Sequence, residues 1–202
     1  MPRQAREIEI GVPLHITQRG NERQDIFRDD EDKAFYIYNF QKYKKRFRVK
    51  MYAWCLMDNH VHFVVEPGTI VGVSKLFSCL NNLYVSYFNS KYSRRGRLFE
   101  SRFYSCLLSD DHFVEALRYV ELNPVRAGLE SEPGFYLWSS AKERLGLRKQ
   151  FYLSSIPRRI FIDDWKSFLS VDEVKEETWN LIRSKTQSTK SQNGGNTDVE
   201  TE

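Results

Sequence analysis

The sequence lacks any long apolar run. No segment reaches the roughly 18 consecutive apolar residues that would suggest a membrane-spanning helix, although 41% of the 202 residues are hydrophobic. The amino-terminal residues also lack the apolar stretch of about 7–15 residues that marks a secretory signal. We therefore expect a cytoplasmic protein with enough apolar residues to bury the core of one main domain.

Cysteine is scarce. The three cysteines, Cys55, Cys79 and Cys106, are odd in number and widely spaced. Each stands among apolar or aromatic neighbours, as a small core residue would. The sequence therefore predicts neither a disulfide framework nor a cysteine zinc site.

Aromatic residues are missing from the end of the chain. Residues 186–202 are mostly Ser, Thr, Gln, Asn, Gly and charged residues, and such a segment is predicted to be disordered because it cannot bury enough apolar surface. Residues 1–130 are expected to form the main domain, and residues 131–185 an accessory segment. Within that segment, 139–147 and 171–184 are expected to form short helices.

Positive charge is concentrated locally. The formal net charge is only +4, yet residues 42–50 (KYKKRFRVK) contain six cations and no acid. Residues 91–102 add five cations against one acid, Glu100. Such clusters can neutralise several phosphates of a nucleic acid. The alternative is an ordinary solvated surface, since most charge runs are no more than that.

Hydrophobic periodicity predicts four strands and three helices in the order β-α-β-β-α-β-α. This order indicates an α+β fold: a ferredoxin-like, antiparallel four-stranded sheet with helices on one face, plus an extra carboxyl-terminal helix. The predicted strands are 14–19, 49–56, 60–66 and 97–108, and the predicted helices are 29–47, 71–90 and one that follows Ser109 and is limited by Pro124.

Two histidines occupy alternate positions of the third predicted strand. Alternate side chains of a strand share a face, so His60 and His62 should point the same way with α-carbons about 7 Å apart. They could bind one metal ion. A His-x-His pair alone is a weak motif, however, and hydrogen bonding inside the core is the competing interpretation.

The last predicted helix carries a phenol and an amide one turn apart. Tyr119 and Asn123 are four residues apart and so share a helix face, at the flank of the apolar stripe rather than its centre. They could face a cleft. The alternative is that Tyr119 only packs and Asn123 only ends the helix before Pro124.

Together these residues suit phosphodiester transfer, in which a metal ion polarises the phosphate and a tyrosine attacks phosphorus. Four motifs, HITQRGN, MDNHVHFVVEP, GRLFESRF and RYVELNPVRAGL, in this order and spacing, resemble the REP-associated tyrosine transposases of the His-hydrophobic-His superfamily. The resemblance spans about two thirds of the chain, and WSSA at residues 138–141 extends it.

The resemblance implies roles for four residues. His60 and His62 would be metal ligands, Tyr119 the nucleophile that becomes linked to a 5′-phosphate, and Asn123 the third ligand. It also implies Mg²⁺ or Mn²⁺ as the cofactor and single-stranded DNA next to a hairpin as the substrate. Related transposases are often homodimers, but nothing in the composition indicates a dimer interface.

Eight basic residues are candidates for phosphate contacts: Arg19, Arg23, Lys44, Lys45, Arg48, Arg94, Arg95 and Arg97. Other residues near the motifs have ordinary interpretations. His15 is expected to be a hydrogen-bonded structural histidine, and Asp58 and Glu115 a turn residue and a surface acid. Either acid could also serve as a partner of a metal ligand.

Two other functions are compatible with the same residues. The first is a DNA-hairpin-binding module without catalytic activity. The second is a metallohydrolase in which His60 and His62 bind zinc and activate water, while Tyr119 is structural. A covalent protein–DNA adduct distinguishes the transposase from both alternatives.

Overall fold

The sheet has four antiparallel strands in the order β2-β3-β1-β4. We describe a computed structural model of the chain, residues 7–149 and 152–170. The strands are β1 (Leu14–Arg19), β2 (Val49–Met57), β3 (His60–Pro67) and β4 (Tyr104–Leu107). This order confirms the predicted ferredoxin-like plan, and the two-residue turn between β2 and β3 confirms the predicted hairpin. The expectations for 171–184 and 186–202 lie outside the described residues.

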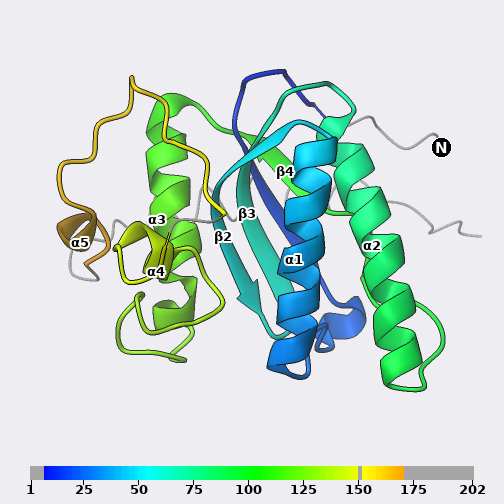
Figure 1. The fold of residues 1–202 in the computed structure, drawn as a ribbon. Helices are drawn as coiled ribbons and strands as arrows, with labels where there is room; N and C mark the ends of the chain where they lie inside the picture. The colour runs from blue at the N-terminus through cyan, green and yellow to red at the C-terminus, as the bar shows by residue number, and fades with distance from the viewer. Residues whose placement is uncertain (1–6, 150–151, 171–202) are drawn as a thin grey trace, which may run out of the picture.

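Three long helices cover the two faces of the sheet (Figure 1). Helices α1 (Asp30–Arg46) and α2 (Gly72–Lys91) lie side by side on one face. Helix α3 (Asp110–Arg126) packs on the opposite face, mainly against β2. The extra helix therefore converts a two-layer fold into three layers.

The alternating residues of β3 divide the core in two. Val61, Phe63 and Val65 belong to the cluster under α1 and α2, where Phe63 stacks on Phe40 with ring centroids 4.3 Å apart. Val64 belongs to the cluster under α3. Since alternate side chains point to opposite faces, His60 and His62 lie on the α3 side.

The predicted strand at 97–108 is wrong in extent. Only Tyr104–Leu107 pair with β1 as a strand, while Phe99 makes an isolated bridge to Gly20. Phe99 and Phe103 fold into the core under α2 instead. The aromatic content that suggested a strand therefore reflects packing of an irregular segment.

The helical expectations near the end of the core also need correction. Helix α3 continues through Pro124 to Arg126; the proline lacks one amide donor, but hydrogen bonding resumes after it, since the Ala127 amide donates to the Asn123 carbonyl at 3.0 Å. The helix expected at 139–147 is only one turn, α4 (Ala141–Arg144). A second single turn, α5 (Trp165–Phe168), follows. None of the described helices could cross a membrane.

The accessory segment pairs with β2, which is an edge strand of the sheet. The amide of Leu56 donates to the Trp138 carbonyl at 2.9 Å, and the amide of Ser140 donates to the Trp54 carbonyl at 2.9 Å. Further along, the amide of Ser154 donates to the Met51 carbonyl at 2.7 Å. An uncovered edge strand could pair with another chain, so these contacts close one side of the sheet.

A buried ion pair joins the accessory segment to α3. Arg144 Nε lies 3.3 Å from Glu121 Oε1, and the Ser140 hydroxyl donates to the same oxygen at 2.6 Å. Both charged side chains are almost inaccessible, 7% for Arg144 and 0% for Glu121. Burial raises the pKa of Glu121 while Arg144 opposes the rise.

We expect Arg144→Met to lower the free energy of unfolding by about 3 kcal/mol, because it leaves the Glu121 carboxylate buried without its cation. Urea denaturation followed by circular dichroism measures the loss. Adding Glu121→Gln to Arg144→Met should restore part of it. A double variant that is less stable than Arg144→Met would contradict this account.

Candidate active site

The His60–His62 pair lies at the turn end of β3, on the face covered by α3. His62 is buried, with 4% of its surface exposed, and the two imidazole rings are 4.9 Å apart at their centroids and nearly perpendicular. The preceding turn is anchored by the amide of Gly20, which donates to the Asn59 carbonyl at 2.9 Å. A β-carbon on Gly20 would lie 2.0 Å from the Gln24 carbonyl oxygen. The segment after β1 that holds the turn therefore requires glycine at this position.

Both histidines have a partner at Nδ1. Asn59 Oδ1 lies 2.6 Å from His60 Nδ1, and because an amide oxygen only accepts, His60 carries its proton on Nδ1. His62 Nδ1 lies 3.1 Å from His15 Nε2 and 3.2 Å from Thr17 Oγ1. A hydrogen bond at one ring nitrogen sets which nitrogen can bind a metal ion. The Nδ1 contacts therefore favour Nε2 as the ligand atom of both rings.

Tyr119 meets the histidines from α3. Its ring centroid lies 5.4 Å from that of His62 and 5.6 Å from that of His15, with both pairs edge to face. Only 5% of Tyr119 is exposed. The Arg126 guanidinium lies 5.8 Å from the centre of the tyrosine ring. Residues from β1, β3 and α3 thus form one contiguous site.

Asn123 lies one turn beyond Tyr119 on α3. Its Nδ2 donates to the Tyr119 carbonyl at 3.3 Å, which leaves Oδ1 as the atom that could bind a metal ion. Among residues 7–149 and 152–170, no group of three His, Cys, Asp or Glu side chains could hold a metal. A site at the histidine pair therefore depends on an amide, water or substrate oxygen for its remaining ligands.

The protonation state of His60 suits metal binding. Burial and then the Arg19 charge lower the pKa of His60 to about 4, with Asp58 opposing the shift. Metal binding requires neutral imidazole, and His60 is neutral well below pH 7. The chemistry of the two imidazoles thus fits a divalent ion, and the Asn123 amide oxygen is the candidate third ligand on α3.

The sequence did not predict that His15 belongs to the candidate active site. It is 1% exposed, stacks on His62 with ring planes 6° apart, and touches Tyr119. The sequence interpretation of His15 as a hydrogen-bonded histidine agrees with its burial. Its hydrogen-bond partner is His62. The register pairs His62 with Thr17, and His15 lies two residues from Thr17 on the same face of β1.

The candidate acids lie outside the site or are engaged elsewhere. Asp58 accepts a hydrogen bond from Lys33 Nζ at 2.7 Å, so that carboxylate is paired with a cation from α1. Glu115 belongs to the half-buried part of α3. Neither completes a three-residue ligand cluster with the histidines among the described residues.

The candidate phosphate-binding residues form two groups. Arg19 pairs with His60 in the sheet register, and the Arg94 guanidinium donates to Gln24 Oε1 at 2.7 Å. The first group lies at the turn end of the sheet: Arg19, Arg23, Arg94, Arg95 and Arg97. The second group lies at the other end: Lys44, Lys45 and Arg48.

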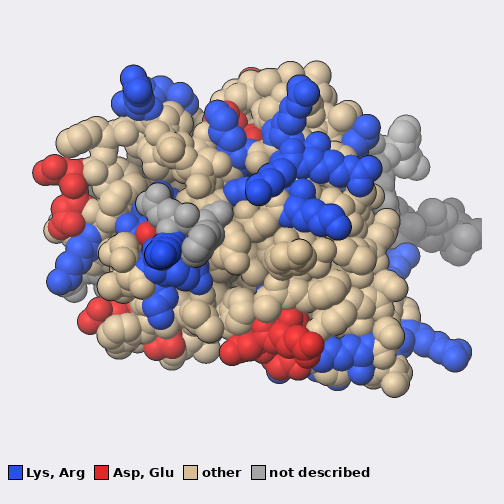
Figure 2. All heavy atoms as spheres, in the orientation of Figure 1, with Lys and Arg blue, Asp and Glu red and all other residues tan. Residues whose placement is uncertain are grey.

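The second group is far from the histidines. These residues come just before Val49, the first residue of β2, whereas Met57, the last residue of β2, pairs with His60. The nine residues of β2 span about 26 Å, which separates this group from the histidines. Figure 2 shows Lys and Arg side chains gathered around the carboxyl-terminal end of α1. Lys44 itself donates to the Tyr152 carbonyl, and burial lowers its pKa to about 8.

The family model for IS200-like transposases matches residues 10–123, more than half of the chain. The chain belongs to this family. The motif resemblance to tyrosine transposases is thereby confirmed, and the match contains His60, His62, Tyr119 and Asn123. The protein is a member of a family of DNA-processing enzymes.

One solved structure supports the fold of this chain, and a second shows a weaker similarity. A REP-associated tyrosine transposase bound to a REP hairpin matches with a TM-score of 0.57 and 16% identity, covering 81% of this chain and 96% of the other. A putative transposase from Deinococcus radiodurans R1 matches with a TM-score of 0.40 and 12% identity, covering 59% of this chain and 96% of the other. The curated proteins contain no match.

Acid should destabilise the protein through His15. Burial lowers the pKa of His15 from 6.5 in an exposed histidine to about 4, so the folded state disfavours its protonation. Its stabilising contribution is complete above about pH 6.5 and declines as the pH falls towards 4, by about 1–2 kcal/mol at pH 5.

Urea denaturation of the unmodified chain and of His15→Gln, at several pH values, measures this contribution. The difference in unfolding free energy between the two proteins should shrink as the pH falls from 7 to 5, because glutamine does not titrate. Parallel pH profiles would show that His15 is not responsible.

Proposed function

We propose that the protein is a metal-dependent single-strand DNA endonuclease and strand transferase that uses Tyr119 as its nucleophile. The observation that carries this proposal is the contact of the Tyr119 ring with His62, at 5.4 Å between centroids, in a member of a transposase family. A phenol held against a potential metal-binding pair can attack a phosphate that is bound there.

In the proposed reaction the Tyr119 oxygen forms a bond to phosphorus and loses its proton. The bond from phosphorus to the 3′ oxygen of the upstream nucleotide breaks, and that oxygen leaves as a 3′ hydroxyl after taking up a proton. The product is a 5′-phosphotyrosine. Attack by another 3′ hydroxyl reverses these bond changes and releases the tyrosine, which completes strand transfer.

The proposed metal site consists of His60, His62 and Asn123, with Mg²⁺ or Mn²⁺ as the ion. A bound ion would withdraw charge from a non-bridging phosphate oxygen. Zinc sites usually have at least three protein ligands of the imidazole, thiolate or carboxylate type, and the described residues contain no such cluster. The ligand set therefore favours the nuclease over the zinc hydrolase.

The proposed substrate is single-stranded DNA next to a hairpin. A structural neighbour with the same fold binds a REP hairpin, and the arginines around the turn end of the sheet could contact phosphates near the histidines. The protein would act on the chromosome in the cytoplasm. A homodimer is compatible with the proposal but is not required by it.

The full chain should form a denaturation-resistant adduct with labelled hairpin oligonucleotides in the presence of Mn²⁺. Tyr119→Phe should abolish the adduct and leave hairpin binding nearly unchanged, because only the phenolic oxygen is removed. His60→Ala should reduce adduct formation by at least a hundredfold if the ion supplies several kcal/mol of charge stabilisation.

Gel electrophoresis detects the adduct and mass spectrometry locates it. Hairpin binding without any adduct over a broad oligonucleotide library would favour the binding module. Released DNA fragments without an adduct, from both the unmodified chain and Tyr119→Phe, would identify water as the nucleophile and favour the hydrolase.

The contact from His15 to His62 should set the affinity for the metal ion. His15→Phe fills similar space but removes the closer of the two described partners of His62 Nδ1 and keeps Thr17 Oγ1, so we expect the Kd for Mn²⁺ to rise about tenfold. His15→Gln places an amide near the former Nε2 and should bind Mn²⁺ within about threefold of the unmodified chain. Titration calorimetry with Mn²⁺ measures both, and equal affinity of His15→Phe would make His15 a space-filling residue.

A further inference from the structure

Exposed cations gather at the carboxyl-terminal end of α1 and in the short connection from α1 to β2 (Figure 2). Lys42, Lys45, Arg46 and Arg48 are all exposed, and we call these four residues the α1-end patch. None of them has an acidic partner among residues 7–149 and 152–170. The patch is therefore a concentration of uncompensated positive charge in the part of the chain that the structure describes.

The two neighbouring lysines are engaged and do not belong to the patch. The Lys44 amine donates to the Tyr152 carbonyl of the accessory segment. Lys50 Nζ lies 2.7 Å from Glu66 Oε1, so an acid on β3 compensates its charge. The four patch residues differ from both, because their charged groups point to solvent without such a partner.

The helix dipole accounts for only part of this arrangement. Cations stabilise the last turn of a helix, and Lys45 and Arg46 occupy that turn of α1. Lys42 lies one turn earlier, three and four residues from these two, where like charges on a helix repel. An anion bound across the three side chains would relieve this repulsion.

Arg48 occupies a backbone position that usually belongs to glycine. Its φ is +54°, and it directly follows the last residue that caps α1, Phe47. Glycine most often fills this position after a helix because a side chain is disfavoured at positive φ. An arginine held at such an angle indicates that its side chain has a use other than stability.

The patch offers charge without a stacking surface. Tyr43 and Phe47, the aromatic residues between the cations, are half-buried and pack against the core under α1 and α2. Tyr38 is exposed but lies a full turn before Lys42. Surfaces that bind single strands combine cations with aromatic side chains on which unpaired bases stack. The patch suits double-stranded DNA instead, because a duplex presents its phosphates outward and keeps its bases stacked inside.

The position of the patch separates it from the candidate active site. The nine residues of β2 place it about 26 Å from the histidines. Figure 2 shows acidic side chains gathered at the opposite end of α1. Four acids and two cations line one hollow there: Asp25, Asp29, Asp30, Asp58, Arg28 and Lys33. A phosphate backbone that followed α1 from the histidines to the patch would pass these acids, whereas a separate duplex would not.

We propose that the α1-end patch binds the phosphate backbone of a DNA duplex that is separate from the strand in the active site. Phosphate contacts carry no sequence information, so this binding is independent of sequence and weakens steeply as the salt concentration rises. It holds the protein on double-stranded DNA while Tyr119 acts on a single strand. The inference goes beyond the proposed function and does not depend on which group is the nucleophile.

The first test measures binding of a fluorescent blunt-ended duplex of 20 base pairs, roughly 68 Å long, by the full chain without added metal. Fluorescence anisotropy at several salt concentrations gives the slope of the logarithm of the association constant against the logarithm of salt concentration. Lys42→Gln combined with Lys45→Gln should reduce this slope by about 1.8, since each phosphate contact contributes about 0.9. The same variant should bind the duplex at least about tenfold more weakly at 0.1 M salt.

Two further variants separate the patch from net charge and from folding. Lys149→Gln combined with Lys166→Gln removes two exposed lysines of the accessory segment and should keep the slope of the unmodified chain. Arg48→Gly should keep the thermal midpoint, because glycine tolerates the positive φ, and should reduce the slope by about 0.9. Equal slopes in the patch variant and the accessory variant would overturn the inference. A larger loss for a single strand than for the duplex would overturn the assignment to double-stranded DNA.

The second test asks whether the two sites are independent. A hairpin with a stem of four base pairs is about 14 Å long, so it cannot reach from the histidines to the patch. With Mn²⁺, the patch variants should form the adduct with this hairpin within about twofold of the unmodified chain. On native gels, adding the duplex to the hairpin complex of Tyr119→Phe should give a slower ternary complex, which the patch variants should not form.

The outcomes distinguish this inference from the proposed function. If the duplex displaces the hairpin and no ternary complex forms, the two DNAs share one surface and the separate duplex site is overturned. If no hairpin gives an adduct but the duplex binds through the patch, the proposed function fails and the duplex site stands.

Discussion

Strand β3 is buried on both faces, and its pairing register with β1 and β2 decides what each face of the sheet contains. With Val61 and Phe63 under α1 and α2, His60 and His62 must face α3. A slip of one residue would exchange the two sets and place imidazoles among the stacked aromatic rings. The aromatic core and the candidate active site are therefore products of one register, and neither could change without the other.

Helix α3 brings the other half of the site to this strand. Its apolar residues, including Phe113 and Leu117, pack on the β2 side of the sheet, and the position of Tyr119 on the helix then directs its ring to His62. The accessory segment holds α3 through the ion pair of Glu121 and Arg144. In the proposed function, a tyrosine on a helix held in this way would need little further ordering when substrate binds.

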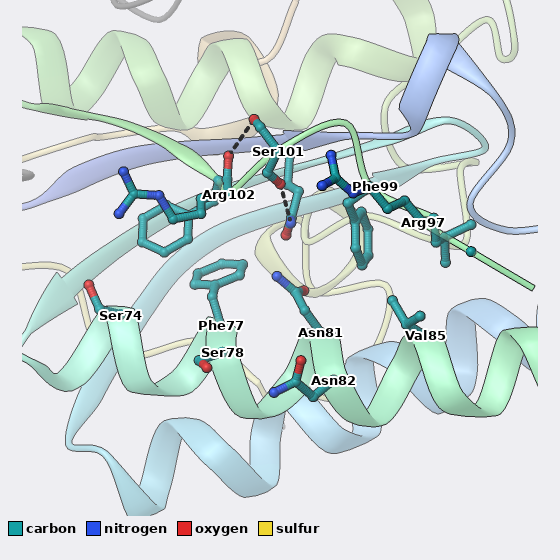
Figure 3. A pocket seen from close by; sticks show the side chains of 14 residues that line it. Ser74, Phe77, Ser78, Asn81, Asn82, Val85, Arg97, Phe99, Ser101 and Arg102 are labelled. Atoms are coloured by element: carbon teal, nitrogen blue, oxygen red, sulfur yellow. Dashed lines mark hydrogen bonds between the residues drawn. The ribbon is translucent and has the colours of Figure 1, made fainter. Parts of the chain in front are cut away.

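The two faces differ in their chemistry. On the α3 face, burial lowers the pKa of His60 and so favours its neutral form, which metal binding requires. On the opposite face, the exposed Arg97 and Arg102 line a pocket beside α2 (Figure 3). Gln18 and Arg19 are neighbours on β1 that point to these two faces.

The sequence alone determined the local features. Alternation identified His60 and His62 as sharing a strand face, helical spacing paired Tyr119 with Asn123, and the order of elements predicted the ferredoxin-like sheet. The sequence overestimated the strand at 97–108, because aromatic residues that pack in an irregular segment resemble those of a strand. It could not show which face of the sheet α3 covers, since that depends on contacts between residues far apart in the chain. For the same reason, only the tertiary structure shows that His15 contacts His62 and Tyr119. It also shows that the basic residues just before β2 lie at the end of the sheet away from the histidines.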